Sequence, residues 1–135
     1  MDESTVLQLI CTALRRFIDP MFARYLTVER LDVPLVTKAQ ITANQNDYAI
    51  GNGSAFRVSS DASRNVTGIT GGFGGKLLII INVGAQSIVL QNQNTGSAAA
   101  NRIITGTGAD YTLATLKTVM LIYDATTTRW NLFGQ

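Results

Sequence analysis

Two short segments of this sequence are apolar or aromatic at every position, and they constrain the fold more than any other feature. The first is Leu77–Ile81 and the second is Val119–Tyr123. Both contain β-branched residues and are flanked by polar residues, which is typical of β-strands. A strand with one face in water alternates apolar and polar side chains. Because these two do not alternate, we expect the domain core to cover one face and a second layer, either the N-terminal region or a neighbouring subunit, to cover the other.

The chain after Pro34 consists of β-branched and aromatic runs separated by clusters of Gly, Asn, Asp and Ser, and these clusters predict turns. Tight hairpins are expected at Gly84-Ala85 and at Asp124–Thr127. Short strands with no helical pattern between them predict a mainly β fold, an antiparallel β-sandwich or jelly roll. The expected strands cover residues 35–42, 47–50, 54–59, 64–70, 76–83, 86–91, 102–105, 110–114, 117–124 and 128–133.

The first 34 residues contain no glycine and follow a helical pattern. Five apolar residues recur at alternating steps of three and four, which places them on one stripe of a helix; they are Leu7, Ile10, Leu14, Phe17 and Met21. Ser4 is the expected N-cap. Asp19-Pro20 predicts a bend between a helix over about 5–18 and a second over about 20–30, since proline cannot donate the interior hydrogen bond. We therefore divide the chain into a helical anchoring or oligomerisation segment, 1–34, and a β-sandwich knob domain, 35–135.

Both apolar features need a partner surface, so we expect the chain to self-associate. The expected interface contains the helical stripe together with four strand residues, Leu78, Ile80, Met120 and Ile122. The single cysteine, Cys11, lies in the apolar part of the helix and is expected to be a small buried hydrophobic residue. Charged residues make up only 15% of the chain, against roughly a quarter in an average soluble protein. A neutral polar surface of this kind suits stable assemblies.

The composition argues against several classes of function. The chain has no histidine, the commonest general base and metal ligand, and only one cysteine, so we expect no enzyme activity, no cofactor and no metal site. A net charge of +2 does not indicate nucleic-acid binding, and no segment has the roughly 18 apolar residues that a membrane span needs. Carboxylate pairs or a calcium site remain weaker alternatives, because each aspartate of the β-region sits beside an expected turn. These aspartates are Asp47, Asp61, Asp110 and Asp124.

The glycine-rich run Gly71–Lys76 invites comparison with a phosphate-binding loop, but its spacing is wrong. Thr70 and Leu77 stand where that loop requires a glycine and a Ser or Thr, and a strand rather than a helix is expected to follow. The run is better explained as a flexible connection, or as a place where backbones of two subunits come close.

The longest polar stretch without an expected strand is residues 92–101. It is either a tolerant surface loop or an outward contact loop for a glycan or another protein, formed by Asn92, Gln93, Asn94 and Thr95. Trp130 and Tyr111 are candidates for stacking on sugar rings. Core or interface packing is favoured for Trp130, because it lies in an alternating strand after a hairpin turn.

Five runs in the second half form a recognisable series: Gly75–Gly84, Ser87–Asn92, Ala100–Ile103, Val119–Asp124 and Arg129–Leu132. The series resembles the β-sandwich knobs of tailed-bacteriophage structural proteins. In those proteins a strand ending in Asn-x-Gly precedes a second strand, an Asn-rich loop and a final hairpin with Tyr-Asp and Arg-Trp. The resemblance covers residues 66–133 and implies a β-sandwich that is commonly trimeric, in fibres, spikes or head-decoration proteins.

The resemblance implies a virion protein that is made in the host cytoplasm. Its partners would be further copies of itself, forming a trimer, and the major capsid protein or other virion proteins. The short segment before residue 35 suits an anchoring foot and is too short for a fibre shaft. Our leading hypothesis is therefore a trimeric capsid decoration (cement) protein that stabilises the head by binding the major capsid protein. The alternative is a tail-associated receptor-binding or glycan-binding knob that uses the loop at 92–101.

Overall fold

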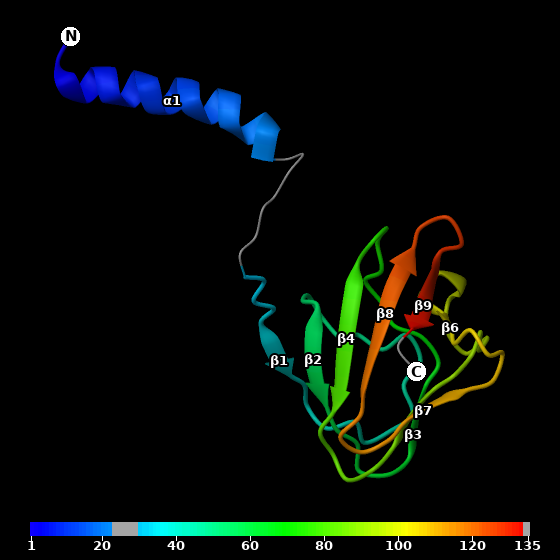
Figure 1. Cartoon of the computed structure of the whole chain (residues 1–135). Coiled ribbons are helices and arrows are strands. Elements are labelled where there is room, and N and C mark those ends of the chain that lie inside the picture. Colours follow the sequence, from blue (N-terminus) through cyan, green and yellow to red (C-terminus); the bar gives the residue numbers. More distant parts are fainter. Residues whose placement is uncertain (23–29, 134–135) are drawn as a thin grey trace. The chain divides into compact units, whose positions relative to one another are not determined.

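The computed structural model describes the backbone of residues 1–22 and 30–133 and the side chains of residues 1–14 and 30–133. The chain forms two compact units, Met1–Asp32 and Val33–Gln135, which we describe one at a time. The first contains a helix, and the second contains the strands (Figure 1). The described residues form a mainly β fold with one N-terminal helix, which agrees with the predicted β class and helical N-terminal segment.

Helix α1 extends over Glu3–Phe22. Its N-cap is Asp2 and not Ser4, because the Asp2 carboxylate accepts a hydrogen bond of 2.7 Å from the Thr5 N–H. This hydrogen bond lowers the pKa of Asp2. The cap begins the helix earlier than the sequence pattern suggested.

The helix continues through Asp19-Pro20 to Phe22, so the predicted end of the first helix at residue 18 is wrong. Pro20 lies in the last turn, where a proline removes one hydrogen bond without interrupting those of the turns before it. The second helix expected over 20–30 overlaps this last turn, its residues 23–29 lie outside the described residues, and Arg30 is not helical.

The second unit contains two β-sheets (Figure 1). The larger has the strand order β1-β2-β4-β8-β9-β6, and the smaller has the order β3-β5-β7. The strands are β1 (Leu35–Thr37), β2 (Ala55–Val58), β3 (Arg64–Val66), β4 (Leu77–Asn82), β5 (Ile88–Leu90), β6 (Ile103–Ile104), β7 (Tyr111–Leu113), β8 (Thr118–Asp124) and β9 (Arg129–Phe133), with a short 3-10 helix η1 (Ala99–Asn101). Most are shorter than expected, and the strand predicted at 47–50 is reduced to a single bridge at Tyr48.

The sheets are mixed, which corrects the expectation of an antiparallel jelly roll. The pairs β1–β2, β2–β4, β3–β5 and β6–β9 are parallel, while β4–β8, β5–β7 and β8–β9 are antiparallel. Parallel bridges such as Gln45–Val66 and Tyr48–Ile69 continue the pattern between strands. Successive turns of the chain therefore stack in a β-solenoid-like arrangement, with roughly 20 to 24 residues in each turn. The expected hairpin at Asp124–Thr127 is present between β8 and β9.

Asn82 explains why no hairpin forms at Gly84-Ala85. Its side chain is fully buried, and Nδ2 donates to the carbonyl oxygens of Gln86 at 2.8 Å and Leu113 at 3.0 Å. Its Oδ1 accepts a hydrogen bond of 3.0 Å from the Gly84 N–H. These bonds turn the chain at the end of β4 into the other sheet, so β4 and β5 are not paired with each other.

The core lies between the two sheets. The larger sheet contributes Leu78, Ile80, Val119 and Leu121, and the smaller contributes Val66, Ile88, Leu90 and Leu113. Trp130 is fully buried, its Nε1 donates to the Ile69 carbonyl at 2.8 Å, and its ring meets that of Tyr123 edge to face at 5.2 Å. Trp130 is thus a core residue, as the sequence favoured. The opposite face of the larger sheet is turned away from this core.

Candidate interaction surfaces

The outer face of the larger sheet carries an apolar row that crosses five neighbouring strands. Its members lie opposite one another in register: Leu35, Ala55, Ile79, Met120 and Phe133. We call this row the outer stripe. It is about 19 Å long at the usual spacing between strands. Paired residues share a face of a sheet, so all five lie on the outer face. Leu35 and Phe133 are exposed, Ile79 and Met120 are partly buried, and Ala55 is buried.

A second apolar pair widens the outer stripe on one side. Leu77 of β4 lies opposite Ile122 of β8, and their exposed fractions are 36% and 41%. On the other side of the stripe, the next row of the outer face mixes polar and apolar side chains: Thr37, Arg57, Ile81 and Thr118. The apolar surface therefore has a polar margin, the usual arrangement of a protein–protein contact.

The strand residues expected at an interface divide between the two faces. Met120 and Ile122 lie on the outer face, whereas Leu78 and Ile80 are buried in the core and are not available to a partner. The sequence showed that both faces of these strands are apolar but did not indicate which face was which. The missing information was the register: Leu35 and Phe133 belong to the surface only because their strands align with Ile79 and Met120.

The helical stripe is also exposed where the structure describes it. Leu7, Ile10 and Leu14 have exposed fractions of 65%, 52% and 48%, and Cys11 is exposed rather than buried. The side chains of Phe17 and Met21 lie outside the described part of the chain. The described helix is not apolar enough along its length to cross a membrane.

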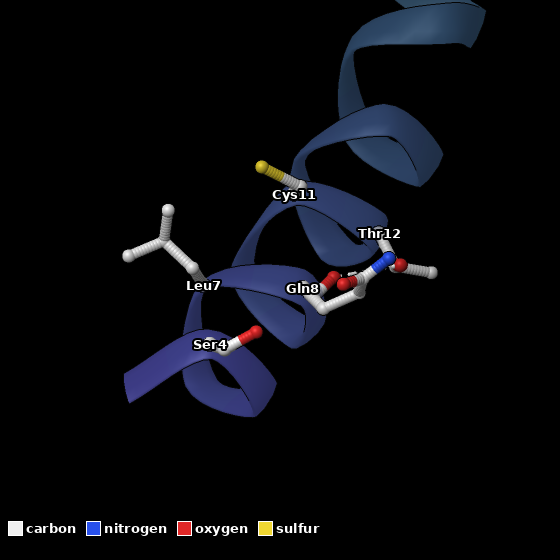
Figure 2. Close-up of a pocket in the computed structure, with 5 residues that line it drawn as sticks. All are labelled: Ser4, Leu7, Gln8, Cys11 and Thr12. Carbon is white, nitrogen blue, oxygen red and sulfur yellow. Dashed lines mark hydrogen bonds between the residues drawn. The ribbon is translucent and has the colours of Figure 1, made fainter. Parts of the chain in front are cut away.

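An open hollow on α1 lies at the border between the apolar and polar faces (Figure 2). It is lined by Ser4, Leu7, Gln8, Cys11 and Thr12. Figure 2 shows Leu7 and Cys11 on one side of the helix and Gln8 and Thr12 on the other. The Thr12 hydroxyl donates to the Gln8 carbonyl at 2.8 Å, so this polar group is engaged within the helix.

The polar loop after β5 is held in place by its own side chains. Asn92 accepts from the Thr105 N–H at 3.1 Å and donates to the Gly108 carbonyl at 3.1 Å. Asn94 donates to the Gln91 side chain and accepts from the Gly96 N–H. Gln93 and Thr95 are exposed, and the Gln93 side-chain oxygen accepts a hydrogen bond from Arg129. Asn92 and Asn94, two of the four residues predicted to make an outward contact, therefore hold the loop in its conformation.

Asp47 ties the far end of this loop to the rest of the domain. Its Oδ1 accepts hydrogen bonds from the Asn101 side chain at 2.9 Å and the Ala98 N–H at 3.0 Å. Its own N–H donates to Ser97 Oγ at 2.9 Å, and Ser97 Oγ lies 2.6 Å from the Thr67 hydroxyl. The hydrogen bond from Asn101 is the largest cause of the lowered pKa of Asp47. Residues distant in sequence thus close one polar network.

The other aspartates of the β-region are also engaged. Asp61 forms an ion pair with Arg64 at 2.7 Å, and this pairing lowers the pKa of Asp61. Asp110 accepts from the Asn92 N–H at 2.8 Å, and Asp124 accepts from Thr127 at 2.8 Å within its turn. No cluster of potential metal ligands occurs among the described residues.

The glycine-rich run packs closely on the domain. A Cβ at Gly72 would collide with the ring of Tyr123. The Lys76 side chain is buried, its Nζ donates to the Gly71 carbonyl at 3.0 Å, and it lies 5.9 Å from the Trp130 ring. The run therefore forms a packed corner before β4, not a cradle for phosphate.

No protein-family model, no curated protein and no solved structure matches this chain.

Proposed function

We propose that this chain is a structural protein of a phage particle, a homotrimeric capsid decoration (cement) protein that binds the major capsid protein and stabilises the head. The observation that carries the proposal is the outer stripe. It lies on a domain whose core is already complete on the other face of the same sheet. An apolar surface that the core does not need is best explained by a partner.

The size of the surface suits a contact repeated by symmetry. Covering each 100 Å² of apolar surface contributes about 2.5 kcal/mol before the cost of association is subtracted. One such contact gives modest affinity alone. A trimer that presents three copies to a shell gains strongly from simultaneous binding. This gain favours a role on a large symmetric particle.

Several residues of the phage resemblance hold corners and turns of this domain, although its mixed sheets differ from the antiparallel sandwich that the resemblance implies. Asn82 and Gly84 form the corner between the two sheets. Asp124 holds the last turn, and the Tyr123 hydroxyl donates to the Ala100 carbonyl at 3.0 Å. These are the positions at which the sequence resembles phage knobs. The partner therefore has to be argued from the outer stripe.

The alternative, a tail-associated glycan-binding knob, is less well supported. Trp130 is buried in the core, and Asn92 and Asn94 are occupied by hydrogen bonds within the domain. Gln93 and Thr95 remain exposed for an outward contact. A glycan array on which the purified protein binds host surface polysaccharide saturably would favour this alternative.

Deleting the coding sequence from the phage tests the leading proposal. Particles without the protein should assemble and then release their DNA at a lower temperature than complete particles, as followed with a DNA-binding dye. Mass spectrometry of purified complete particles should detect the chain in a fixed ratio to the major capsid protein. Absence of the chain from particles, or an unchanged release temperature, would contradict the proposal.

A further inference from the structure

The apolar face of α1 is unusually wide. Successive residues of a helix are rotated by about 100°. Seven apolar residues between positions 6 and 14 therefore span an arc of roughly 200°: Val6, Leu7, Leu9, Ile10, Cys11, Ala13 and Leu14. All seven are exposed. Glu3, in the first turn, is a charged residue within the same arc. A helix that packs on one neighbour needs an apolar stripe of only about 100°.

The spacing along this face follows a coiled-coil repeat. Leu7, Ile10 and Leu14 are separated by steps of three and then four residues, so Leu7 and Leu14 occupy a positions and Ile10 occupies a d position. Phe17 and Met21 continue the repeat in the sequence. Leucine at a together with isoleucine at d shifts the preference from two strands to three or four.

The residues that flank the a and d positions also favour more than two helices. In this register the described residues beside the seam, at e and g, are Ser4, Val6, Cys11 and Ala13, none of which is charged. A two-stranded coil would leave them in water, whereas a bundle of three helices gives each helix two neighbours and covers both flanks. Uncharged flanks therefore favour more than two helices.

The polar face leaves a membrane surface as the competing partner. The described polar face has Ser4, Thr5, Gln8 and Thr12. Arg15 and Arg16 follow in the same helix, and helices that lie on membranes carry such basic residues on the polar side. The heptad spacing and the uncharged flanks favour further copies of the chain, and the vesicle assay below separates the two partners.

We propose that α1 from three copies of this chain packs as a parallel three-helix coiled coil, with Leu7, Ile10 and Leu14 in its core. The number three rests on the proposed function, while the helical contact rests on the apolar arc. Parallel packing follows from three-fold symmetry, which closes only when all copies point in the same direction. The helix is then the element that sets the oligomeric state.

Light scattering on the full chain tests the contact. Wild-type protein should have three times the chain mass of 14.5 kDa. Leu14→Asp, which places a charge in the seam, should give single chains. Thr12→Asp places the same charge on the polar face and should leave the trimer intact. Trp130 fluorescence should be the same in all three proteins, which shows that the β-domain remains folded. A wild-type mass of one, two or four chains, or a trimeric Leu14→Asp protein, would overturn the proposal.

Cross-linking tests the direction of the helices. Cys11 is the only cysteine, so the double variant Glu3→Cys, Cys11→Ala carries one thiol, at a d position near the N-terminus. Parallel helices bring these thiols together, and mild oxidation should give disulfide-linked dimers. In an antiparallel bundle the two thiols would lie at opposite ends of the bundle, about 27 Å apart, because 18 residues of helix separate them along the axis. An absence of cross-links would overturn parallel packing.

Two further assays separate this proposal from its competitors. Wild-type protein should not float with anionic phosphatidylserine vesicles. The helix would be assigned to membranes, and the bundle overturned, if wild-type protein is a single chain in solution and floats with the vesicles, and if Leu14→Asp abolishes this flotation. The second assay measures binding of wild-type protein to particles. Wild-type protein that is a single chain in solution and still binds particles would refute the helical bundle but not the particle contact.

Discussion

Ile79 on β4 and Met120 on β8 lie directly opposite each other on the outer face of the larger sheet, while their neighbours Leu78 and Leu121 lie opposite each other in the core. A shift of one residue in a strand exchanges its two faces. The two rows of similar side chains therefore have different roles. The inner row stabilises the domain, and the outer row is available for a partner.

Adjacent residues of β8 should respond very differently to substitution. Leu121 is fully buried, so Leu121→Ala should lower the free energy of unfolding by about 2 to 5 kcal/mol. Ile122 is 41% exposed on the outer face, so Ile122→Thr should cost less than about 1 kcal/mol. Urea unfolding of the purified variants measures both. Equal losses, or the reverse order, would show that the register of β8 is wrong.

Asn82 should be among the polar residues most sensitive to change. Asn82→Ala removes two buried donors and leaves the carbonyl groups of Gln86 and Leu113 without these hydrogen bonds. We expect a loss of about 2 to 4 kcal/mol in the free energy of unfolding. Asn44→Ala, at an exposed position where the side chain accepts from the Asn65 N–H, should cost much less. Similar losses in the two variants would contradict the role of Asn82 as the corner of the fold.

Asp47 should make the loop at 94–101 sensitive to acid. Its pKa is lowered in the folded protein, so its stabilising effect is present above the ordinary aspartate pKa of 3.8 and is lost as the pH falls through the lowered value. The stability advantage of wild-type protein over Asp47→Asn should shrink below about pH 4. Unfolding curves of the two proteins over a pH series measure this difference. An advantage that is independent of pH would contradict the charge dependence of the network.

Trp130 is the only tryptophan, so fluorescence reports its surroundings directly. It is fully buried and its Nε1 is hydrogen bonded, which predicts blue-shifted emission with little quenching by iodide. Host polysaccharide should leave this emission unchanged. Emission typical of exposed tryptophan would contradict the core position, and quenching by polysaccharide would revive the stacking hypothesis.

The sequence predicted the elements of this fold better than their connections. Continuous apolar runs and turn residues located β4, β8 and the β8–β9 hairpin. They did not reveal that the chain turns a corner at Asn82, because the Asn and Gly of the segment Asn82–Gly84 are also typical of a hairpin turn. Parallel stacking is determined by contacts between residues about twenty positions apart, such as Gln45 and Val66, which local periodicity does not show.

The candidate surfaces were predictable only in part for the same reason. Met120 and Ile122 were found because their strand is apolar throughout, and Leu78 and Ile80 were assigned to the surface because the phase of the alternation was unknown. The loop at 92–101 reads as a polar surface loop in the sequence. Its ties to Asp47 and Thr105 depend on residues brought close by the fold.

Rebinding of purified protein to particles that lack it tests the central claim, that the outer stripe joins this protein to a phage head. Wild-type protein should bind to saturation in co-sedimentation and restore the temperature of DNA release. Met120→Asp, in the middle of the stripe, should fold and fail to bind, whereas Ala85→Asp, at an exposed corner, should bind normally. Wild-type protein that does not rebind, or Met120→Asp protein that binds as well as wild type, would contradict the account.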